Sequence, residues 1–278
     1  MSDRYCVFGN PVHHSRSPAI HRAFAAQCAQ DVSYTAILAP IGGFTEAVGE
    51  FVASGGRGAN VTLPFKEEAF ALASRLSERA RIAGAVNTLD FAGPGILGDN
   101  TDGAGLVQDL TGNLGLSIAG RRVLLLGAGG AARGVLGPLL EAGPRLLVVA
   151  NRTVARAQAL ARRFAGVARV HACGFDDLAG ESFDLVINAT SASLTGDVPP
   201  LPKGLFAAGA LAYDMVYGDT ETPFLGLARR QGVERLADGL GMLVEQAAES
   251  FLVWRGVRPQ TTPVIAMLRV ARPPAGQR

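Results

Sequence analysis

The stretch Leu124–Gly134 reads LLLGAGGAARG and decides the fold of the second half of the chain. An apolar run ends at Gly127, and residues 127–132 then match the pattern G-x-G-x-x-G/A. Glycines at these places allow a tight turn and a close approach of the backbone to a pyrophosphate, which the N-terminus of the following helix faces. The motif alone is common in glycine-rich chains, but a strand before it and a helix after it are the context of a dinucleotide-binding loop.

The segments around this loop alternate apolar strands with amphipathic helices. Continuous apolar strands are typical of a parallel sheet that is covered on both faces. We therefore predict an α/β domain of the doubly wound, Rossmann type. The expected strands are residues 122–127, 145–151, 168–173, 183–190 and 210–216, and the expected helices are 129–143 and 153–166.

The end of the second strand of this domain indicates which dinucleotide binds. An NAD site expects a carboxylate there for the ribose 2′-hydroxyl. The chain has ANRTVAR instead, with Arg152 and Arg156 one helical turn apart. Guanidinium groups suit a 2′-phosphate, so this segment favours NADP. The alternative is a solvated helix surface, which is our interpretation of Arg162 and Arg163.

The first hundred residues indicate a second α/β domain with shorter strands. The chain has 278 residues, which is long for one core, and we place a boundary near 102–120. Two helices at the end have no strand after them and could cap either domain. The expected strands are 4–9, 33–40 and 58–64 with a hairpin around Gly93–Gly95, and the expected helices are about 18–29, 43–53, 66–73, 77–83, 240–255 and 262–271.

The composition is that of a globular protein of the cytoplasm. Hydrophobic residues make up 48% and charged residues 18%, and a net charge of +2 is too near neutral to indicate a nucleic-acid or membrane surface. Cys6, Cys28 and Cys173 lack the spacing of a disulfide framework or a metal site. We expect neither a signal peptide nor a membrane span, because the N-terminus lacks an apolar core and no apolar run is long enough.

Lys66 is unusual because only two of the 26 basic residues are lysine. It lies in GANVTLPFKEEA, residues 58–69, where a chain that uses arginine almost everywhere has an amine. A lysine amine can exchange a proton with a substrate, whereas a guanidinium, with a pKa above about 12, cannot usefully do so. Lys66 is thus an acid/base candidate. The alternative is a surface amine at a helix start, which is how we interpret Lys203.

Ser15 and Ser17 precede a predicted helix in NPVHHSRSPAIH. Ser17 is well placed as the N-cap, with Pro18 in the first helical position. Two hydroxyls beside a helix N-terminus also make a carboxylate site. The segment's three histidines, His13, His14 and His21, are further acid/base candidates, although paired histidines in a loop are more often exposed, and no metal-ligand spacing is present.

Two further polar residues have both a structural and a functional interpretation. Asp102, in GDNTDG, caps a helix that begins at Gly103 or takes part in chemistry. Asn87 lies in the apolar strand GAVNTL, where a buried amide needs partners from the backbone or from a ligand.

Ten blocks of the sequence resemble the shikimate dehydrogenase family in their order, from about Tyr5 to Val270. They are VFGNPVHHSRSPAIH, GANVTLPFKEEA, AGAVNTL, GDNTDG, GAGGAARG, NRT, INATS, YDMVY, TPFL and ADGLGMLVEQAA. Ten blocks in order are more specific than any one of them. The NRT block is most similar to the NADP-dependent biosynthetic branch.

The resemblance implies reversible NADPH-dependent reduction of 3-dehydroshikimate to shikimate, a step toward chorismate and the aromatic amino acids. It implies a substrate-binding domain of residues 1–102 plus about 240–278, an NADP domain of about 103–239, and a cleft between them. Acid/base catalysis is implied for Lys66 and Asp102. The implied substrate ligands are Ser15, Ser17, Thr62, Asn87, Tyr217 and Gln246. The implied cofactor contacts are Gly127, Ala128, Gly129, Gly130, Ala131, Asn151, Arg152, Thr153, Arg156, Thr190, Met215, Gly239 and, more weakly, Glu78.

Two alternative functions stay open at this point. A dehydrogenase of broader range would also take quinate. A non-catalytic protein that senses NADP(H) would need the glycine loop and the arginines, but not Ser15, Ser17, Lys66, Asn87 and Asp102 together. We expect a small-molecule substrate, no metal, no nucleic-acid or membrane partner, and a monomer or homodimer.

Overall fold

The computed structural model describes residues 2–166 and 169–270, and it divides into two compact units. Among the described residues, the first unit contains residues 2–105 and Leu243–Met267, and the second contains Leu106–Met242 and residues 268–270. The chain passes from one unit to the other inside helix α5 (Asp102–Gln108) and returns inside helix α9 (Leu240–Arg255).

The first unit is built on a six-stranded mixed sheet with the order β2-β1-β3-β5-β6-β4. β1 pairs in parallel with β2 and β3, whereas β5 runs antiparallel to β3 and β6. The strands are β1 (Asp3–Gly9), β2 (Val32–Leu38), β3 (Gly56–Val61), β4 (Arg75–Leu76), β5 (Thr88–Asp90) and β6 (Leu97–Asp99). The helices are α1 (Ser17–Gln27), α2 (Phe44–Ala53), α3 (Lys66–Leu72), α4 (Glu78–Ala83) and the part of α10 (Thr262–Val270) up to Met267.

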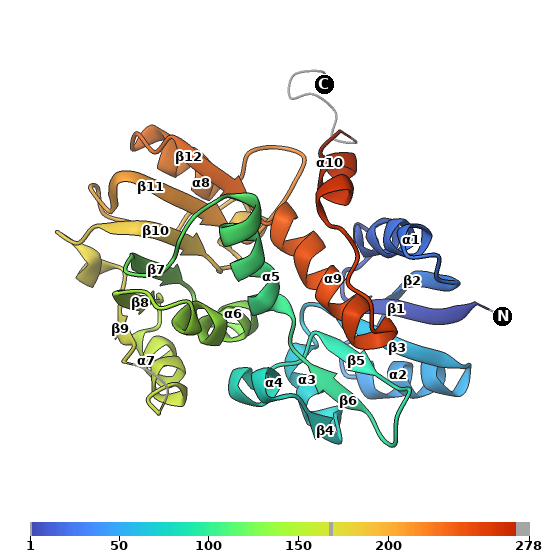
Figure 1. Cartoon of the computed structure of the whole chain (residues 1–278). Helices are drawn as coiled ribbons and strands as arrows, with labels where there is room; N and C mark the ends of the chain where they lie inside the picture. The colour runs from blue at the N-terminus through green and yellow to red at the C-terminus, as the bar shows by residue number, and fades with distance from the viewer. Residues whose placement is uncertain (1, 167–168, 271–278) are drawn as a thin grey trace. The chain divides into compact units, whose positions relative to one another are not determined.

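Alternation along β1 separates two cores on the two faces of this sheet. Cys6 and Phe8 belong to the core that α2 covers, where Phe8 meets the ring of Phe44 edge-on at 5.9 Å. Tyr5 and Val7 point to the opposite face. Helices α1 and α9 cover that face, and α2 lies on the other side of the sheet (Figure 1). The opposite face also carries the polar residues described below.

The second unit is a fully parallel six-stranded sheet with the order β12-β11-β10-β7-β8-β9. Chain order reverses between β7 and β10, as in a doubly wound dinucleotide-binding fold. Figure 1 shows α8 on one side of the sheet and α6 and α7 on the other. The strands are β7 (Arg122–Leu126), β8 (Leu146–Ala150), β9 (His171–Cys173), β10 (Phe183–Asn188), β11 (Phe206–Asp214) and β12 (Arg235–Asp238). The α-helices are α6 (Gly130–Glu141), α7 (Val154–Arg163) and α8 (Pro223–Arg230), with short helical turns at Asp109–Asn113, Asp176–Leu178 and Ala192–Leu194.

The predicted fold class is confirmed, and the differences concern short elements. The strand expected at 168–173 begins at His171, and its first residue lies outside the described residues, as does residue 271 of the last expected helix. The sequence did not predict β4, α8 or β12, which are short or carry mixed polarity. Within the described ranges, no helix has the length and apolar character to cross a membrane.

Candidate active site

Lys66 and Asp102 form an ion pair in the first unit. Lys66 is the first residue of α3, and its Nζ donates to Asp102 Oδ2 at 2.5 Å. The two side chains are 15% and 7% exposed, so the pair is largely shielded from water and yet reachable by a small molecule. Such an arrangement fixes the direction of the amine and places a proton donor beside a carboxylate.

Asn87 holds the second oxygen of the Asp102 carboxylate. Its Nδ2 donates to Asp102 Oδ1 at 2.8 Å and to Thr101 Oγ1 at 2.9 Å, and its Oδ1 accepts from the Thr101 amide at 2.8 Å. Asn87 is 2% exposed. The buried amide that the sequence singled out therefore finds protein partners, and it orients the carboxylate that in turn orients Lys66.

Gln246 joins the same group from α9. Its Oε1 lies 3.3 Å from Asn87 Nδ2, and its own Nε2 donates to Leu243 O at 2.7 Å. Lys66, Asn87, Asp102 and Gln246 come from four distant segments of the sequence, and the structure brings them together. Only the resemblance, and no spacing in the sequence, indicated Gln246.

The serine pair lies at the start of α1, but not as a helix cap. The helix begins at Ser17 with Arg16 in the cap position, and no side chain caps it, so the N-cap interpretation of Ser17 is wrong. Ser15 Oγ accepts from the Ser17 amide at 3.3 Å, and the buried side chain of Ser17 lies beside the hydroxyl of Tyr34. Thr62 follows β3, and its methyl group lies against Gly9, at the end of β1.

If Ser15 and Ser17 bind the substrate carboxylate, as the resemblance implies, Ser15→Ala and Ser17→Ala should each raise KM for shikimate by about tenfold, because each variant then loses one hydrogen bond to a charged group. Steady-state kinetics and thermal unfolding of each variant provide the measurement. Ser33→Ala, at an exposed position of β2, is the control and should change neither. Lowered melting temperatures with unchanged kinetics for both variants would rule out the carboxylate role.

The three histidines do not join this group. His13 and His14 are exposed and meet edge-on, with ring centroids 5.1 Å apart. His21 is 1% exposed and stacks on Tyr34 with ring centroids 4.2 Å apart. Its Nε2 has no hydrogen-bond partner among the described residues. Burial lowers the pKa of His21 to about 3, with a neighbouring Asn60 acting in the opposite direction. His21 is therefore a neutral member of an aromatic core.

This burial predicts a pH dependence of stability. The unfolded chain binds a proton at His21 below about pH 6.5 and the folded chain does not until about pH 3. Its neutral form thus contributes stability above pH 6.5 that is lost as the pH falls toward 3. We expect His21→Phe, which keeps an aromatic ring, to remove about 2 kcal/mol of the loss in unfolding free energy between pH 6.5 and 5.

Urea unfolding at pH 7, 6 and 5 measures this effect. The control is His14→Phe, because His14 is exposed and lies outside the aromatic core that holds His21. Parallel pH curves for His21→Phe and the unchanged chain would show that the folded protein accommodates the charged imidazole.

The glycine loop of the second unit has the geometry that its sequence predicted. Gly127 has a φ of 107°, which a side chain would strain, and a Cβ there would lie 3.1 Å from the backbone of Ala189. The loop therefore lies against the end of β10, at the point where the strand order reverses. Helix α6 begins at Gly130, so its free amides stand at the carboxyl edge of the sheet, where dinucleotide phosphates bind.

Arg152 and Arg156 stand at the end of β8 and in the first turn of α7. Both are exposed, and in the described part of the chain neither guanidinium pairs with a carboxylate. The Asn151 side chain donates to Thr153 O at 2.9 Å and shapes the turn between the strand and the helix. The two arginines are thus available for an anion at the end of β8, the strand that pairs with β7, which leads into the glycine loop.

Asp214 and Asn188 are two buried residues that the sequence analysis missed, and they position the predicted cofactor contacts Thr190 and Met215. Asp214 Oδ2 accepts from Thr222 at 2.6 Å and Ser193 at 2.7 Å, and Asp214 Oδ1 accepts from Asn188 at 3.1 Å. Asn188 Oδ1 in turn accepts from the Thr190 hydroxyl at 2.7 Å. Burial raises the pKa of Asp214, against the effect of these donors. An aspartate inside an apolar strand was the available signal.

Backbone contacts complete this edge. Met215 donates its amide to Asn188 O at 2.9 Å, and a Cβ on Gly239 would meet Met215 O at 2.2 Å, so only glycine allows the two loops to approach so closely. Tyr217 lies in the loop after β11, in the second unit and not with the other predicted substrate ligands. Glu78 is exposed on α4 in the first unit and pairs with Arg81.

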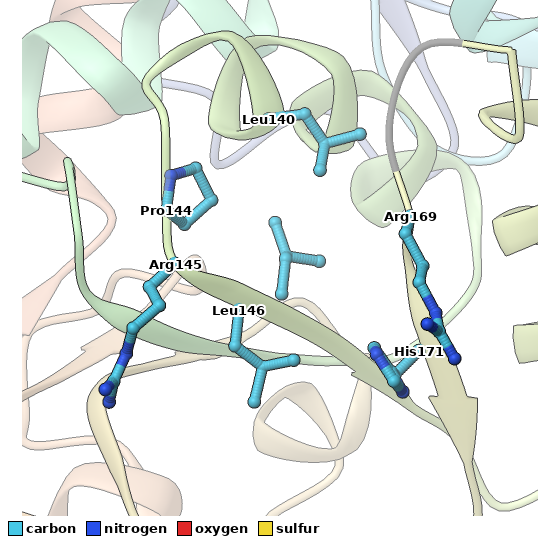
Figure 2. Close-up of a pocket in the computed structure, with 7 residues that line it drawn as sticks. Leu140, Pro144, Arg145, Leu146, Arg169 and His171 are labelled. Atoms are coloured by element: carbon cyan, nitrogen blue, oxygen red, sulfur yellow. The ribbon is translucent and has the colours of Figure 1, made fainter.

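A cavity of about 290 Å³ lies elsewhere in the second unit (Figure 2). It is found at the amino ends of β8 and β9, whereas the glycine loop follows the carboxyl end of β7. None of the predicted site residues lines it. The lining residues are Leu140, Pro144, Arg145, Leu146, Leu147, Arg169 and His171.

Comparison with known proteins assigns this geometry to a family. Residues 7–89 match the shikimate dehydrogenase substrate binding domain, residues 108–195 match the shikimate / quinate 5-dehydrogenase family, and residues 239–269 match the shikimate 5′-dehydrogenase C-terminal domain. A shikimate dehydrogenase (NADP(+)) of Dechloromonas aromatica is 65% identical over 97% of this chain and 98% of its own length. The chain belongs to the shikimate dehydrogenase family.

Other members of the shikimate dehydrogenase family agree in sequence and in structure. A shikimate dehydrogenase (NADP(+)) of Nitrosospira multiformis is 64% identical over 97% of this chain and 98% of its own length. A shikimate 5-dehydrogenase of Thermus thermophilus, crystallised with NADP(H) and shikimate, is 35% identical with a TM-score of 0.85, covering 97% of this chain and 99% of its own. The predicted family, fold class and enzyme class are confirmed.

A solved structure with a similar fold is named for a different reduction. A 5-ketofructose reductase of Gluconobacter is 29% identical with a TM-score of 0.83, covering 97% of this chain and 99% of its own. Membership in the shikimate dehydrogenase family therefore fixes the kind of chemistry, and the individual side chains of the site must account for the substrate.

Proposed function

We propose that this chain catalyses the reversible reduction of 3-dehydroshikimate to shikimate, with Lys66 and Asp102 as its proton-transfer pair. The observation that carries the proposal is the 2.5 Å contact between these two side chains, with Asn87 holding the other carboxylate oxygen. The shikimate dehydrogenases (NADP(+)) to which the chain is similar carry out the same kind of reaction. The reaction places the chain in chorismate and aromatic amino acid biosynthesis.

The proton step follows from the ion pair. A bound NADPH would supply the hydride, and the substrate's ketone oxygen would then carry negative charge that requires a proton. The Lys66 ammonium donates that proton, and in the reverse direction the amine accepts it. Asp102 keeps the amine oriented and stabilises its charged form, while Asn87 prevents the carboxylate from rotating. Positioned acid/base groups of this kind contribute roughly 10²–10⁴ in rate.

The rest of the substrate site consists of hydroxyl and amide groups. We assign Ser15 and Ser17 to the substrate carboxylate, because both hydroxyls lie next to the N-terminus of α1. Gln246 is assigned to a ring hydroxyl beside the proton-transfer pair, as are Thr62, Asn87 and, from the second unit, Tyr217. Hydroxyl-rich substrates need such groups, because each substrate hydroxyl that loses water must regain a partner.

The cofactor site fits NADP(H) better than NAD(H). Gly127 leaves room for the phosphates, and the unpaired Arg152 and Arg156 suit a 2′-phosphate where an NAD site would have a carboxylate. We propose the 127–131 loop, the 151–156 segment, Thr190, Met215 and Gly239 as cofactor contacts, and Glu78 as a weaker one. The NADP domain is then about 103–239, and residues 1–102 plus about 240–278 form the substrate domain.

The decisive experiment follows absorbance at 340 nm with NADP and either shikimate or quinate. We expect turnover with shikimate and a much lower kcat/KM with quinate. Comparable values for both would establish the broader quinate/shikimate dehydrogenase, which the description of the family matched by residues 108–195 also names. No turnover by folded protein that still binds NADPH would favour the non-catalytic sensor. Replacing NADP by NAD in the same assay tests cofactor choice.

The setting of the enzyme is also part of the proposal. We propose a cytoplasmic location, because the reaction draws on the NADPH pool, and a monomer or homodimer without nucleic-acid or membrane partners. Light scattering after gel filtration, with and without NADP, measures the assembly state. A stable larger oligomer would contradict this part of the proposal.

A further inference from the structure

Asn60 is a buried polar residue of the first unit that no part of the proposed chemistry uses. It lies on β3 and is 6% exposed, and its backbone pairs with Thr88 on the neighbouring strand β5. In the sequence GANVTL it looks like any polar residue of a short strand. Its side chain faces the side of the sheet that α1 and α9 cover, where it contacts Tyr34 and Ser250.

Both ends of the Asn60 amide are fully used. Its Oδ1 accepts the hydroxyl of Tyr34 at 2.7 Å, and its Nδ2 lies 2.9 Å from Ser250 Oγ and 3.2 Å from both Thr88 Oγ1 and Asn87 O. These partners come from β2, β5 and α9 and from the segment just before β5. A buried amide with all its partners inside the protein fixes the relative positions of the segments that supply them.

One end of this network reaches the serine pair. The hydroxyl of Tyr34, bonded to Asn60, lies beside the side chain of Ser17, which stands one helical turn before His21 on α1. The ring of Tyr34 is held in place by its stacking on His21, with an interplanar angle of 7°. A change in the position of Asn60 would therefore move the hydroxyl against which Ser17 is oriented.

The other end reaches the proton-transfer pair. Thr88 Oγ1 bonds with Asn60 Nδ2 and donates to Asn87 Oδ1 at 2.9 Å. Asn87 Nδ2 then donates to Asp102 Oδ1, and Asp102 Oδ2 accepts from Lys66. An unbroken series of hydrogen bonds thus runs from Tyr34, which lies beside Ser17, to Lys66, and Asn60 stands within it.

We propose that Asn60 is a positioning residue that couples the carboxylate-binding serines to the Lys66–Asp102 pair. This inference rests on the proposed function, and it explains how both ends of one small substrate are held in register. Among the described residues, no hydrogen bond joins Ser15 or Ser17 directly to Lys66 or Asp102. Because the intermediate groups are buried, each lost hydrogen bond leaves an unpaired polar atom, and the remaining ones must rearrange.

The test replaces Asn60 by leucine, which has a similar volume and no hydrogen-bonding groups. We expect Asn60→Leu to lower kcat for shikimate oxidation by about tenfold or more, because small displacements of reacting groups are costly. Its KM for NADP should stay within about twofold, since the predicted cofactor contacts of the glycine loop lie in the other unit. Val48→Ala, in the core on the opposite face, is the matched control for lost stability and should leave kcat unchanged.

A double-mutant cycle then tests the coupling itself. Ser17→Ala and Asp102→Asn are combined with and without Asn60→Leu. With Asn60 present, the combined loss in kcat/KM should differ from the product of the single losses by about threefold or more. With leucine at position 60, the losses should become multiplicative. Multiplicative losses in both backgrounds would overturn the proposal.

Tyr34→Phe keeps the proposal testable if Asn60→Leu does not fold. It removes only the hydroxyl between Ser17 and Asn60 and keeps the ring that stacks on His21. We expect a rise in KM for shikimate, with kcat lowered less than in Asn60→Leu. Kinetics within about twofold of the unchanged chain for each variant that folds would show a purely structural role. If the wild-type protein does not turn over shikimate, the proposed function itself is refuted.

Discussion

Replacing Lys66 by arginine is expected to lower kcat for shikimate oxidation by about 10²-fold or more. The substitution keeps a positive charge and hydrogen-bond donors within reach of Asp102, but a guanidinium does not give up a proton at working pH. Lys66→Ala removes both charge and proton and should lose at least as much. Steady-state kinetics with saturating NADP separates kcat from KM, and NADPH binding followed by fluorescence should survive in both variants.

The exchange at the second lysine is the control. Lys203 is exposed, and Lys203→Arg should leave all kinetic constants unchanged. If Lys66 only anchored a substrate hydroxyl, Lys66→Arg would keep much of its kcat and change mainly in KM. A near-normal kcat in Lys66→Arg would therefore contradict the proposed role of Lys66 in proton transfer.

Asp102→Asn tests the partner of the amine. It removes the charge that orients Lys66 but keeps an oxygen for Asn87, whose Nδ2 now contacts Asp102 Oδ1 at 2.8 Å. We expect a lower kcat. The double variant with Lys66→Ala should lose less than the product of the single losses, because the two residues act as a unit.

The second unit was largely predictable because its signals are local. Strand, glycine loop and helix follow one another within residues 122–141, and the strands are apolar throughout because helices cover both faces of the sheet. The elements that sequence reasoning missed are those without such a pattern. β12 reads RLAD, and its four residues show neither alternation nor a continuous apolar run.

The first unit was predictable as a set of elements but less so as a site. Its residues Lys66, Asn87, Asp102 and Gln246 come from α3, the segment just before β5, α5 and α9. No spacing in the sequence indicates a contact across 159 residues, such as that between Asn87 and Gln246. Lysine usage marked Lys66, and an asparagine in an apolar strand marked Asn87. Nothing comparable marked Asn60, because its importance depends on partners from three other elements.

The serine pair shows why a local rule can mislead. A serine before a proline is a good N-cap in sequence, yet α1 begins one residue earlier than that rule requires, at Ser17 itself. The buried Ser17 side chain packs beside Tyr34 and caps no helix amide. Propensity predicted the helix, and a tertiary contact decided what the side chain does.

Replacing Arg152 by alanine is expected to raise KM for NADP by roughly ten- to hundredfold, since a charge-assisted bidentate contact to the 2′-phosphate is lost. KM for NAD should change little, because NAD has no phosphate at that position. The measurement is the ratio of kcat/KM for the two cofactors, which should fall by the same factor. Arg152 stands at the end of β8, the strand next to the glycine loop's own strand, where the adenosine ribose of a dinucleotide binds.

The matched control lies on the same helix. Arg162 is exposed near the end of α7, and Arg162→Ala removes the same charge without touching the strand end. It should leave the cofactor ratio unchanged, so a fall with Arg162→Ala as well would indicate a general loss of positive field. Arg156→Ala should act in the same direction as Arg152→Ala but less strongly, because it stands one turn further along the helix. Equal losses with NADP and NAD in Arg152→Ala would place its contact elsewhere on the dinucleotide, and the choice of NADP would then need another origin.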